Sequence, residues 1–211
     1  MSIELFNIDC MEYMKDCEDN AFDLAIVDPP YRDQNQPTQT MRSASKASNS
    51  KRFVKTEILG SKPKAEYFKE LKRVSKEQIV WGSNNFSSNG DYKGFVVWIK
   101  SNIPENFTMS MAEIASLSNG LSTTSKCFSE TSSRGGYSIH PTQKPVKLYE
   151  FLFKHYAKPT NRILDTHLGS GSSAIAAHYY GVDFVGCELD EDYFKAAQER
   201  FDRETRQVAM F

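Results

Sequence analysis

Two adjacent prolines lie between an acid and an aromatic residue in the stretch Asp28-Pro29-Pro30-Tyr31. The Asp28 carboxylate and the Pro29 carbonyl oxygen could each accept a hydrogen bond from an NH2 group. Proline fixes its own φ and restricts the preceding residue to extended geometry, so these acceptors would need little reorganisation. Tyr31 offers a flat face on which a planar base could stack. The four residues therefore predict a catalytic site for the exocyclic amine of a planar base.

The apolar run at residues 24–27 places this tetrad at the end of a buried parallel strand. Ligands of open α/β sheets bind at that edge of the sheet. A simpler interpretation stays open here, because proline cannot donate to a sheet ladder and Asp-Pro-Pro also serves to end a strand.

A second chemical pattern occupies residues 162–188, where a predicted strand, a glycine-bearing turn, a helix and another strand follow one another. Glycines let the backbone approach a ligand closely, and Glu188 at the second strand's tip could accept from ribose hydroxyls. Gly169 and Glu188 are nineteen positions apart, close to the roughly 20 expected of a nucleoside-binding βαβ unit. No third glycine completes G-x-G-x-x-G, which favours a nucleoside without a pyrophosphate and disfavours a nucleotide-dependent oxidoreductase. A turn made only for packing is the alternative.

Other elements can be assigned from apolar periodicity, and they indicate one α/β domain over residues 1–211. We predict further strands at residues 3–8, 78–82, 94–100 and 111–118, and helices at residues 11–17, 64–74, 146–157 and 172–180. Two polar stretches lack such periodicity, and we predict a flexible loop at residues 32–62 and a second loop at residues 118–138.

Charge is distributed unevenly along the chain, whose net charge is only −1. Residues 1–31 carry a net charge of −7, whereas residues 32–76 carry +8. A basic block directly after the tetrad would suit a polyanionic substrate. A solvated, flexible loop is the plainer explanation of such a block.

Composition excludes several classes of protein. No apolar run reaches the length of a membrane span, and the N-terminus lacks the pattern of a signal peptide, so we expect a cytoplasmic protein. The four cysteines form no Cys-x-x-Cys pair and have no histidine at metal-ligand spacing. This pattern argues against a disulfide framework and against a zinc site, and we expect no metal.

Three motifs together resemble those of a known family. Asp28-Pro29-Pro30-Tyr31 resembles the Asp-Pro-Pro-Tyr motif of amino-methylating DNA methyltransferases, and residues 165–171 are similar to their S-adenosylmethionine loop. Residues 140–145, His-Pro-Thr-Gln-Lys-Pro, are similar to the segment that precedes this loop in the β-type permuted subgroup. The order of the motifs matches that subgroup over nearly the whole chain. The resemblance implies a doubly wound, mostly parallel α/β sheet of the class I methyltransferase (Rossmann-like) type, circularly permuted.

The resemblance also implies a role for individual residues. Asp28, Pro29 and Tyr31 would hold the target base, and Lys144 with Thr142 would lie beside the methionine tail of the cofactor. The predicted cofactor-binding residues are Asp9 (adenine amine), Cys10, Asp28, Thr142, Lys144, Asp165, His167, Gly169, Gly171, Ser172, Glu188 (ribose) and Leu189. The family commonly has Asp-Pro-Phe before the loop and Thr after its second glycine, whereas this chain has Asp165-Thr166-His167 and Ser172. For His140 and His167, ordinary packing beside a loop is the alternative.

From this resemblance we expect S-adenosylmethionine-dependent methylation of adenine N6 in double-stranded DNA, with the base flipped out of the duplex. Cytosine N4 is the close alternative, and Asp at the first tetrad position favours adenine in this family. A non-catalytic DNA-binding protein with the same fold is a second alternative; a homodimer is also left open. The predicted DNA-binding residues are Arg32, Arg42, Lys46, Lys51, Arg52 and Lys55.

Overall fold

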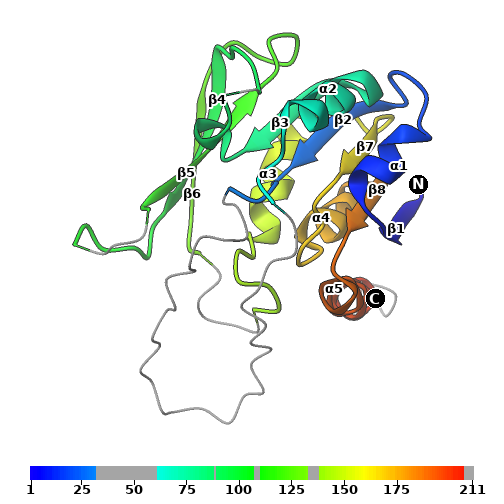
Figure 1. The fold of residues 1–211 in the computed structure, drawn as a ribbon. Helices are drawn as coiled ribbons and strands as arrows, with labels where there is room; N and C mark the ends of the chain where they lie inside the picture. The colour runs from blue at the N-terminus through cyan, green and yellow to red at the C-terminus, as the bar shows by residue number, and fades with distance from the viewer. Residues whose placement is uncertain (32–60, 88, 107–109, 133–137, 207–211) are drawn as a thin grey trace.

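A computed structural model of the chain describes residues 1–31, 61–87, 89–106, 110–132 and 138–206. Eight strands in these ranges form one sheet (Figure 1). Their order across the sheet is β1 (Ile3–Asn7), β8 (Asp183–Glu188), β7 (Arg162–Asp165), β2 (Phe22–Val27), β3 (Ser75–Trp81), β5 (Ala112–Leu117), β4 (Gly94–Lys100) and β6 (Lys126–Glu130). Neighbouring strands are parallel except at β5, which is antiparallel to both β3 and β4. The mostly parallel α/β sheet is the predicted fold class.

Helices cover both faces of the sheet, because successive side chains of a strand point to opposite faces. Leu24 and Ile26 of β2 pack in one apolar cluster with helices α3 (Val146–Tyr156) and α4 (Ser172–Tyr180). Ala25 and Val27 pack in the other cluster with α1 (Cys10–Lys15) and α2 (Ala65–Val74). Helix α5 (Glu191–Arg206) joins the first cluster through Ala197. The sheet is therefore doubly wound.

The crossover connections reverse direction between two central neighbours, β2 and β7. From β2 the chain passes through α2 to β3 on one side, whereas from β7 it passes through α4 to β8 on the other. Ligands of doubly wound sheets bind at such a switch point, beyond the carboxyl ends of the strands. Asp28 follows β2 directly and Asp165 ends β7, so both acids lie at this point.

Two features differ from the sequence-based expectation. Residues 118–138 do not form a continuous loop, because β6 (Lys126–Glu130) pairs in parallel with β4 and its Phe128 ring packs 5.0 Å from Phe151. The strand was missed because its residues are polar or charged except at Cys127 and Phe128. The 16-residue helix α5 was not predicted either. Strands β4, β5 and β6 form a wing that extends from the rest of the sheet (Figure 1).

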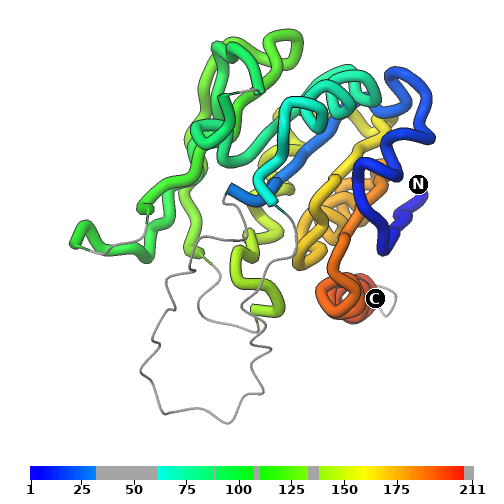
Figure 2. Tube along the Cα trace, in the orientation of Figure 1, coloured from blue at the N-terminus to red at the C-terminus, as the bar shows by residue number. Residues whose placement is uncertain are grey.

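The loop predicted at residues 32–62 lies almost wholly outside the described residues. Tyr31 and Lys62 both approach the Phe86 ring, at 6.0 Å between ring centroids and 5.8 Å from Nζ to centroid. The two ends of the described chain at this gap lie close together (Figure 2). None of the helices in the described ranges has the length and apolarity that a membrane crossing requires.

Candidate active site

The carboxyl ends of five parallel strands meet at one edge of the sheet, and most of the predicted site residues lie along it. Across the sheet, from β1 to β3, this edge presents Asp9, Glu188, Asp165, Asp28 and Gly82. Tertiary structure thus brings the tetrad and the glycine turn, which are far apart in sequence, to adjacent strand ends.

Asp165 is buried at the end of β7, where one donor from the following loop and one from the first turn of α4 hold its carboxylate. The Ser173 hydroxyl donates to Oδ2 at 2.6 Å, and the His167 backbone N–H donates to Oδ1 at 3.0 Å. Burial raises the pKa of Asp165 to about 7 despite these two hydrogen bonds, and the Asp28 carboxylate adds to the rise. The turn that follows is therefore fixed by Asp165 before any ligand binds.

Glu188 at the tip of β8 holds the glycine turn from the other side. Its carboxylate accepts from the backbone N–H of Gly169 at 2.8 Å and of Asp190 at 3.0 Å. Burial raises the pKa of Glu188. Gly169 and Gly171 both have positive φ, +54° and +73°, a conformation that glycine adopts without strain.

The remaining predicted cofactor residues lie near this turn. Asp9 caps α1 by accepting from the Met11 N–H at 2.7 Å, and Cys10 begins that helix. Burial raises the pKa of the Cys10 thiol to about 12, so it is neutral near pH 7. Leu189 is 46% exposed directly after Glu188.

His167 packs in the way that the plainer interpretation expected. Its Nδ1 lies 2.8 Å from the Thr166 hydroxyl, and its ring meets the Tyr67 ring edge-on at 5.5 Å. Burial lowers its pKa to about 4, so the imidazole is neutral near pH 7.

Asp28 has both carboxylate oxygens engaged. The Tyr31 hydroxyl donates to Oδ1 at 2.6 Å, and the Lys144 ammonium donates to Oδ2. The sequence analysis placed Lys144 beside a cofactor tail, and that contact stays a prediction. The structure shows Lys144 paired with the acid of the tetrad.

Lys144 is almost completely buried, with 3% of its side chain exposed. Its Nζ also lies 3.0 Å from Glu113 Oε2 and 5.4 Å from the centroid of the Trp81 ring. Burial alone would lower the pKa of Lys144, but the carboxylates of Asp28 and Glu113 outweigh it and the pKa is raised. Glu113 in turn pairs through Oε1 with Lys100 at 2.5 Å.

The Tyr31 ring packs closely against Gly82 at the end of β3. A methyl group on Gly82 would fall 2.0 Å from a ring carbon of Tyr31, so only glycine leaves room for the ring. Gly82 also has φ +65° and is fixed by its N–H, which donates to the Ile114 carbonyl at 2.8 Å. Burial, followed by the Asp28 charge, raises the pKa of Tyr31 well above its usual value.

One hydroxyl joins the two motifs of the C-terminal half. Ser172, at the start of α4, donates to the Lys144 carbonyl at 2.7 Å and accepts from the Arg200 guanidinium at 2.8 Å. Arg200 of α5 also donates to the Ser170 carbonyl at 3.0 Å. Thr142 is exposed, and its hydroxyl lies 3.1 Å from His140 Nδ1. The glycine turn and the segment around Lys144 are thus held together.

Sequence reasoning missed several residues that the structure brings to the site. They are Gly82, Lys100, Glu113 and Arg200. A charged residue inside an otherwise apolar or small-residue strand was a usable signal for Glu113, and a glycine at a strand end for Gly82. The predicted DNA-binding residues from Arg32 to Lys55 lie outside the described residues. In the ranges that the structure describes, no cluster of side chains could hold a metal ion.

Chemically, this edge combines two kinds of acceptor. Asp9, Asp165 and Glu188 surround a turn with a nearby helix start, which suits a nucleoside-like ligand. Asp28 and Tyr31 present an anionic acceptor beside an aromatic ring, which suits an amine on a planar base.

Comparison with known proteins gives matches in both sequence and fold. A protein-family model described as DNA methylase matches residues 80–199. A 65-residue stretch is 40% identical to putative methylase YubD of Escherichia coli (strain K12); it covers 31% of this chain and 29% of that protein. The match therefore spans less than a third of this relative.

Two solved structures share the fold over nearly the whole chain. The M1.HpyAVI–SAM complex superimposes with a TM-score of 0.61 at 20% identity, covering 94% of this chain and 100% of that one. PvuII DNA methyltransferase (cytosine-N4-specific) superimposes with a TM-score of 0.65 at 11% identity, covering 99% and 93%.

Proposed function

This chain belongs to the DNA methylase family, and on that basis we propose that it transfers a methyl group from S-adenosylmethionine to the N6 amine of adenine in double-stranded DNA. The base would be flipped out of the duplex to reach the tetrad. One observation carries the proposal: Asp28 and Asp165 lie at the ends of neighbouring strands at the switch point of the sheet. Methyl transfer requires the methyl donor and the methyl acceptor to lie side by side, and two neighbouring strand ends would hold them in this way.

The cofactor is assigned from the acids around the glycine turn. M1.HpyAVI, which shares this fold, was solved in complex with SAM. In this chain Glu188 would accept from the ribose hydroxyls, Asp9 would accept from the adenine amine, and Gly169 and Gly171 would leave room for the methionine part. Cys10, Thr142, His167, Ser172 and Leu189 border this site, and their contacts with the cofactor are part of the proposal.

The reaction would depend mainly on how the amine nitrogen and the methyl group are positioned relative to each other. S-adenosylmethionine, when bound, supplies a methyl group on a sulfonium. Asp28 and the Pro29 carbonyl would accept from the two amine hydrogens and orient the nitrogen lone pair toward that methyl group. A nitrogen–carbon bond forms as the carbon–sulfur bond breaks, and the amine then loses one proton to solvent. Asp28 would stabilise the positive charge that grows on the nitrogen.

We infer a route by which the amine would reach Asp28 from the two groups that its carboxylate already binds. Lys144, which binds Oδ2, is 3% exposed and also pairs with Glu113, whereas the Tyr31 hydroxyl on Oδ1 belongs to a partly exposed side chain. The incoming amine would replace that hydroxyl on Oδ1, and the Tyr31 ring would stack on the base. Tyr31→Phe should therefore keep much of the activity, whereas Tyr31→Ala should lose stacking worth about 1–3 kcal/mol.

Cytosine N4 is the second candidate target. Its support is the fold shared with a cytosine-N4-specific enzyme. The tetrad logic is the same for both amines, and Asp as its first residue favours adenine. A non-catalytic DNA-binding role is less well supported, because Asp28, Asp165 and Glu188 are all present at the expected edge.

Digestion of treated DNA tests this proposal. DNA incubated with the protein and S-adenosylmethionine would be digested to nucleosides and analysed by mass spectrometry, and N6-methyladenine is the expected product. N4-methylcytosine would instead assign the second candidate, and no methylated nucleoside would overturn catalysis.

A pair of variants on the same strand makes the test specific. Asp28→Asn should abolish transfer, whereas cofactor binding should change little because the other predicted cofactor-binding residues are kept. The matched control is Asp23→Asn at the opposite end of β2, where Asp23 pairs with Lys76 at 2.7 Å. Substantial turnover by Asp28→Asn would remove Asp28 from the proposed role.

We further propose that the basic segment after Tyr31 engages the DNA backbone through Arg32, Arg42, Lys46, Lys51, Arg52 and Lys55. Neutralising Lys51, Arg52 and Lys55 together should weaken DNA binding and reduce its salt dependence by roughly 0.9 in log–log slope per lost phosphate contact. Cofactor affinity should not change. Superimposable salt curves for the wild type and the triple variant would contradict this role.

A further inference from the structure

Four charged side chains form a continuous chain of ion pairs behind the tetrad. Lys144 pairs with Asp28 and lies 3.0 Å from Glu113, which pairs with Lys100 at 2.5 Å. Only 3% of the Lys144 side chain and 8% of the Lys100 side chain are exposed. Glu113 comes from β5, a strand that none of the sequence motifs includes.

The geometry creates a conflict at Asp28 that Glu113 resolves. An ammonium group held against one carboxylate in a buried place cancels most of its charge. Asp28 needs that charge, because the amine nitrogen becomes positive as the methyl group arrives. With Lys100 included, the four side chains have no net charge, but Lys144 is shared between two carboxylates and not held by Asp28 alone. Lys100 binds the other oxygen of Glu113, on the side away from Lys144.

We propose that Glu113 is a positioning residue for methyl transfer, which draws the charge of Lys144 away from Asp28 and keeps Asp28 able to accept the target amine. This inference rests on the proposed function. Protein stability alone does not explain why Glu113 is buried beside Lys144. Removing a second carboxylate from water costs desolvation free energy, and a well-packed apolar side chain at this position would avoid that cost.

Most of the other titratable groups around Lys144 are neutral near pH 7. Burial raises the pKa of Tyr31 and of Tyr149 well above the usual value, so both phenols are neutral. Burial and the Lys144 charge together lower the pKa of His140 to about 4, so this imidazole is neutral as well. Asp165 is the exception, because burial raises its pKa to about 7 and its charge changes close to neutral pH.

The test is Glu113→Gln, which keeps the size of the side chain and an oxygen acceptor for Lys100 but removes the charge. The kcat of methyl transfer should fall on the order of tenfold. KM for DNA and for S-adenosylmethionine should stay close to the wild-type values. Glu113→Asp should restore most of the rate, because it restores a carboxylate. Glu130→Gln is the matched control at the same sheet edge, where Glu130 lies 3.4 Å from the exposed Lys147.

The pH profile separates this role from a structural one. With Glu113 removed, a single carboxylate holds the buried Lys144 charged, so its pKa falls and it loses its proton at a lower pH than in the wild type. Neutral Lys144 no longer offsets the negative charge of Asp28. The kcat of Glu113→Gln should therefore approach that of the wild type at the alkaline end of the pH profile. The double variant Glu113→Gln/Lys144→Gln should likewise exceed Glu113→Gln in kcat near pH 7.

Three results would overturn the inference. If the wild type is active and Glu113→Gln has the same kcat, the inference about Glu113 is overturned and the proposed function stands. A fall in kcat that is constant with pH and is not restored by Glu113→Asp assigns Glu113 a merely structural role. If Glu113→Gln does not fold, the rates of Glu113→Asp and of the double variant test the role of Glu113 instead. A folded double variant without activity would contradict the charge argument. A wild type that transfers no methyl group overturns the proposed function itself.

Discussion

The two halves of the sheet edge satisfy their acids in different ways. In the half formed by β1, β8 and β7, the carboxylates of Asp9, Asp165 and Glu188 accept from backbone amides and hydroxyls of the adjoining turns. In the half formed by β2 and β5, Asp28 accepts from the Lys144 ammonium and Glu113 forms ion pairs with Lys144 and Lys100; Lys144 stands 116 positions after Asp28. We call these the amide half and the ammonium half.

The difference has an electrostatic consequence. Amide donors are neutral and do not offset burial fully, so the pKa values of Asp165 and Glu188 are raised. Ammonium donors carry charge, and in Glu113 the charges of Lys144 and Lys100 overcome burial and lower the pKa. The amide half can therefore shape a turn without fixing charge, whereas the ammonium half holds a fixed anion where a positive nitrogen would form. Variants that remove one donor or one acid test this comparison.

The largest expected effect follows from removing the shared ammonium. Lys144→Met leaves Asp28 and Glu113 without their common cation, and it should lower the free energy of unfolding by about 3–5 kcal/mol. In the amide half, Arg200→Met removes the donor of two buried neutral groups of the glycine turn and one partner of the 36% exposed Glu204, which Arg203 also approaches, so it should cost about 1–3 kcal/mol. Urea unfolding near pH 7 measures both. An equal or larger cost for Arg200→Met would break the comparison.

The two halves should also respond to pH in opposite directions. Asp165 has a folded pKa of about 7 against 3.8 in the unfolded chain. A raised pKa contributes stability that is complete below the unfolded value and is lost as the pH rises through the folded one. Relative to Asp165→Asn, the wild type should therefore lose up to about 4 kcal/mol of unfolding free energy between about pH 4 and pH 7.

Glu113 has the opposite sign, since its folded pKa is lowered from 4.5. Its contribution is present above that value and is lost as the pH falls through the folded pKa. Relative to Glu113→Gln, the wild type should lose unfolding free energy only at acidic pH, below the usual glutamate pKa of 4.5. Unfolding curves of both pairs across pH decide this, and differences of the same sign in both pairs would contradict it.

A smaller effect is expected on the cofactor. Glu188→Ala removes the proposed acceptor of the ribose hydroxyls and should weaken S-adenosylmethionine binding by about 10- to 100-fold in calorimetry. Glu191→Ala is the control, because Glu191 begins α5 and pairs only with the exposed Lys195 among the described residues. Unchanged affinity in Glu188→Ala would count against a nucleoside at this turn.

The smallest expected effect concerns the glycine beneath Tyr31. Gly82→Ala and Gly181→Ala both place a side chain at positive φ, so each should cost about 1–2 kcal/mol of stability. A Cβ at Gly181 meets no heavy atom within 4 Å, whereas at Gly82 it displaces the Tyr31 ring. Only Gly82→Ala should therefore lower the rate of methyl transfer beyond its effect on stability. Equal rates in the two variants would show that the resting position of Tyr31 does not matter.

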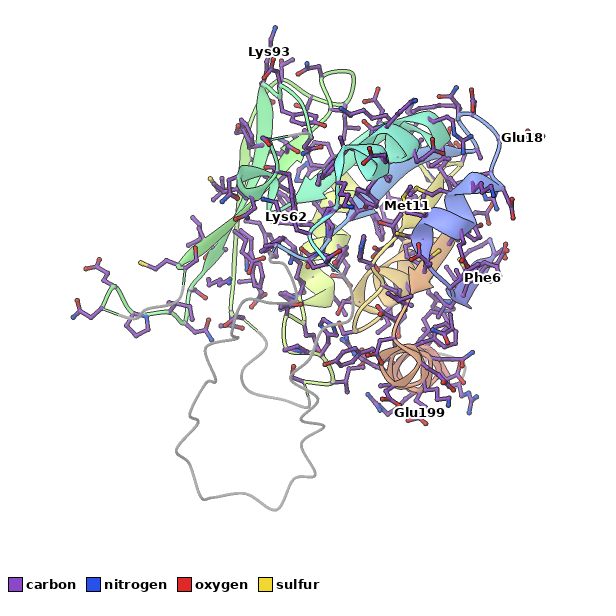
Figure 3. The ribbon with its side chains drawn as sticks, in the orientation of Figure 1. Phe6, Met11, Glu18, Lys62, Lys93 and Glu199 are labelled. Carbon is purple, nitrogen blue, oxygen red and sulfur yellow. The ribbon has the colours of Figure 1, made fainter. Side chains whose placement is uncertain are left out.

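The two halves differ in how far their side chains are exposed to solvent. Side chains such as Phe6 and Glu199 lie on the outside of the amide half, and Lys62 lies where the chain resumes beside the tetrad (Figure 3). The donors and acids of the ammonium half are largely buried. Their effects should therefore depend less on salt than those of exposed pairs.

The amide half was largely determined by the sequence. Apolar runs define β7 and β8, glycines mark the turn between β7 and α4, and the bonds to Asp165 and Glu188 run mostly to groups close in the chain. Local backbone conformation decides such features, so they are readable from a short stretch. Strand β6 and helix α5 were missed because their residues are mostly polar or charged, which weakens the apolar pattern.

The ammonium half was decided by the tertiary structure. Nothing near Asp28 in the sequence indicates that Lys144 pairs with it, that Glu113 shares this ammonium, or that Gly82 makes room for Tyr31. These contacts join strands and a loop whose relative positions depend on the crossovers and on the antiparallel register of β5. A charge pair between such distant positions is set by how the sheet is assembled, and local sequence carries no record of that assembly.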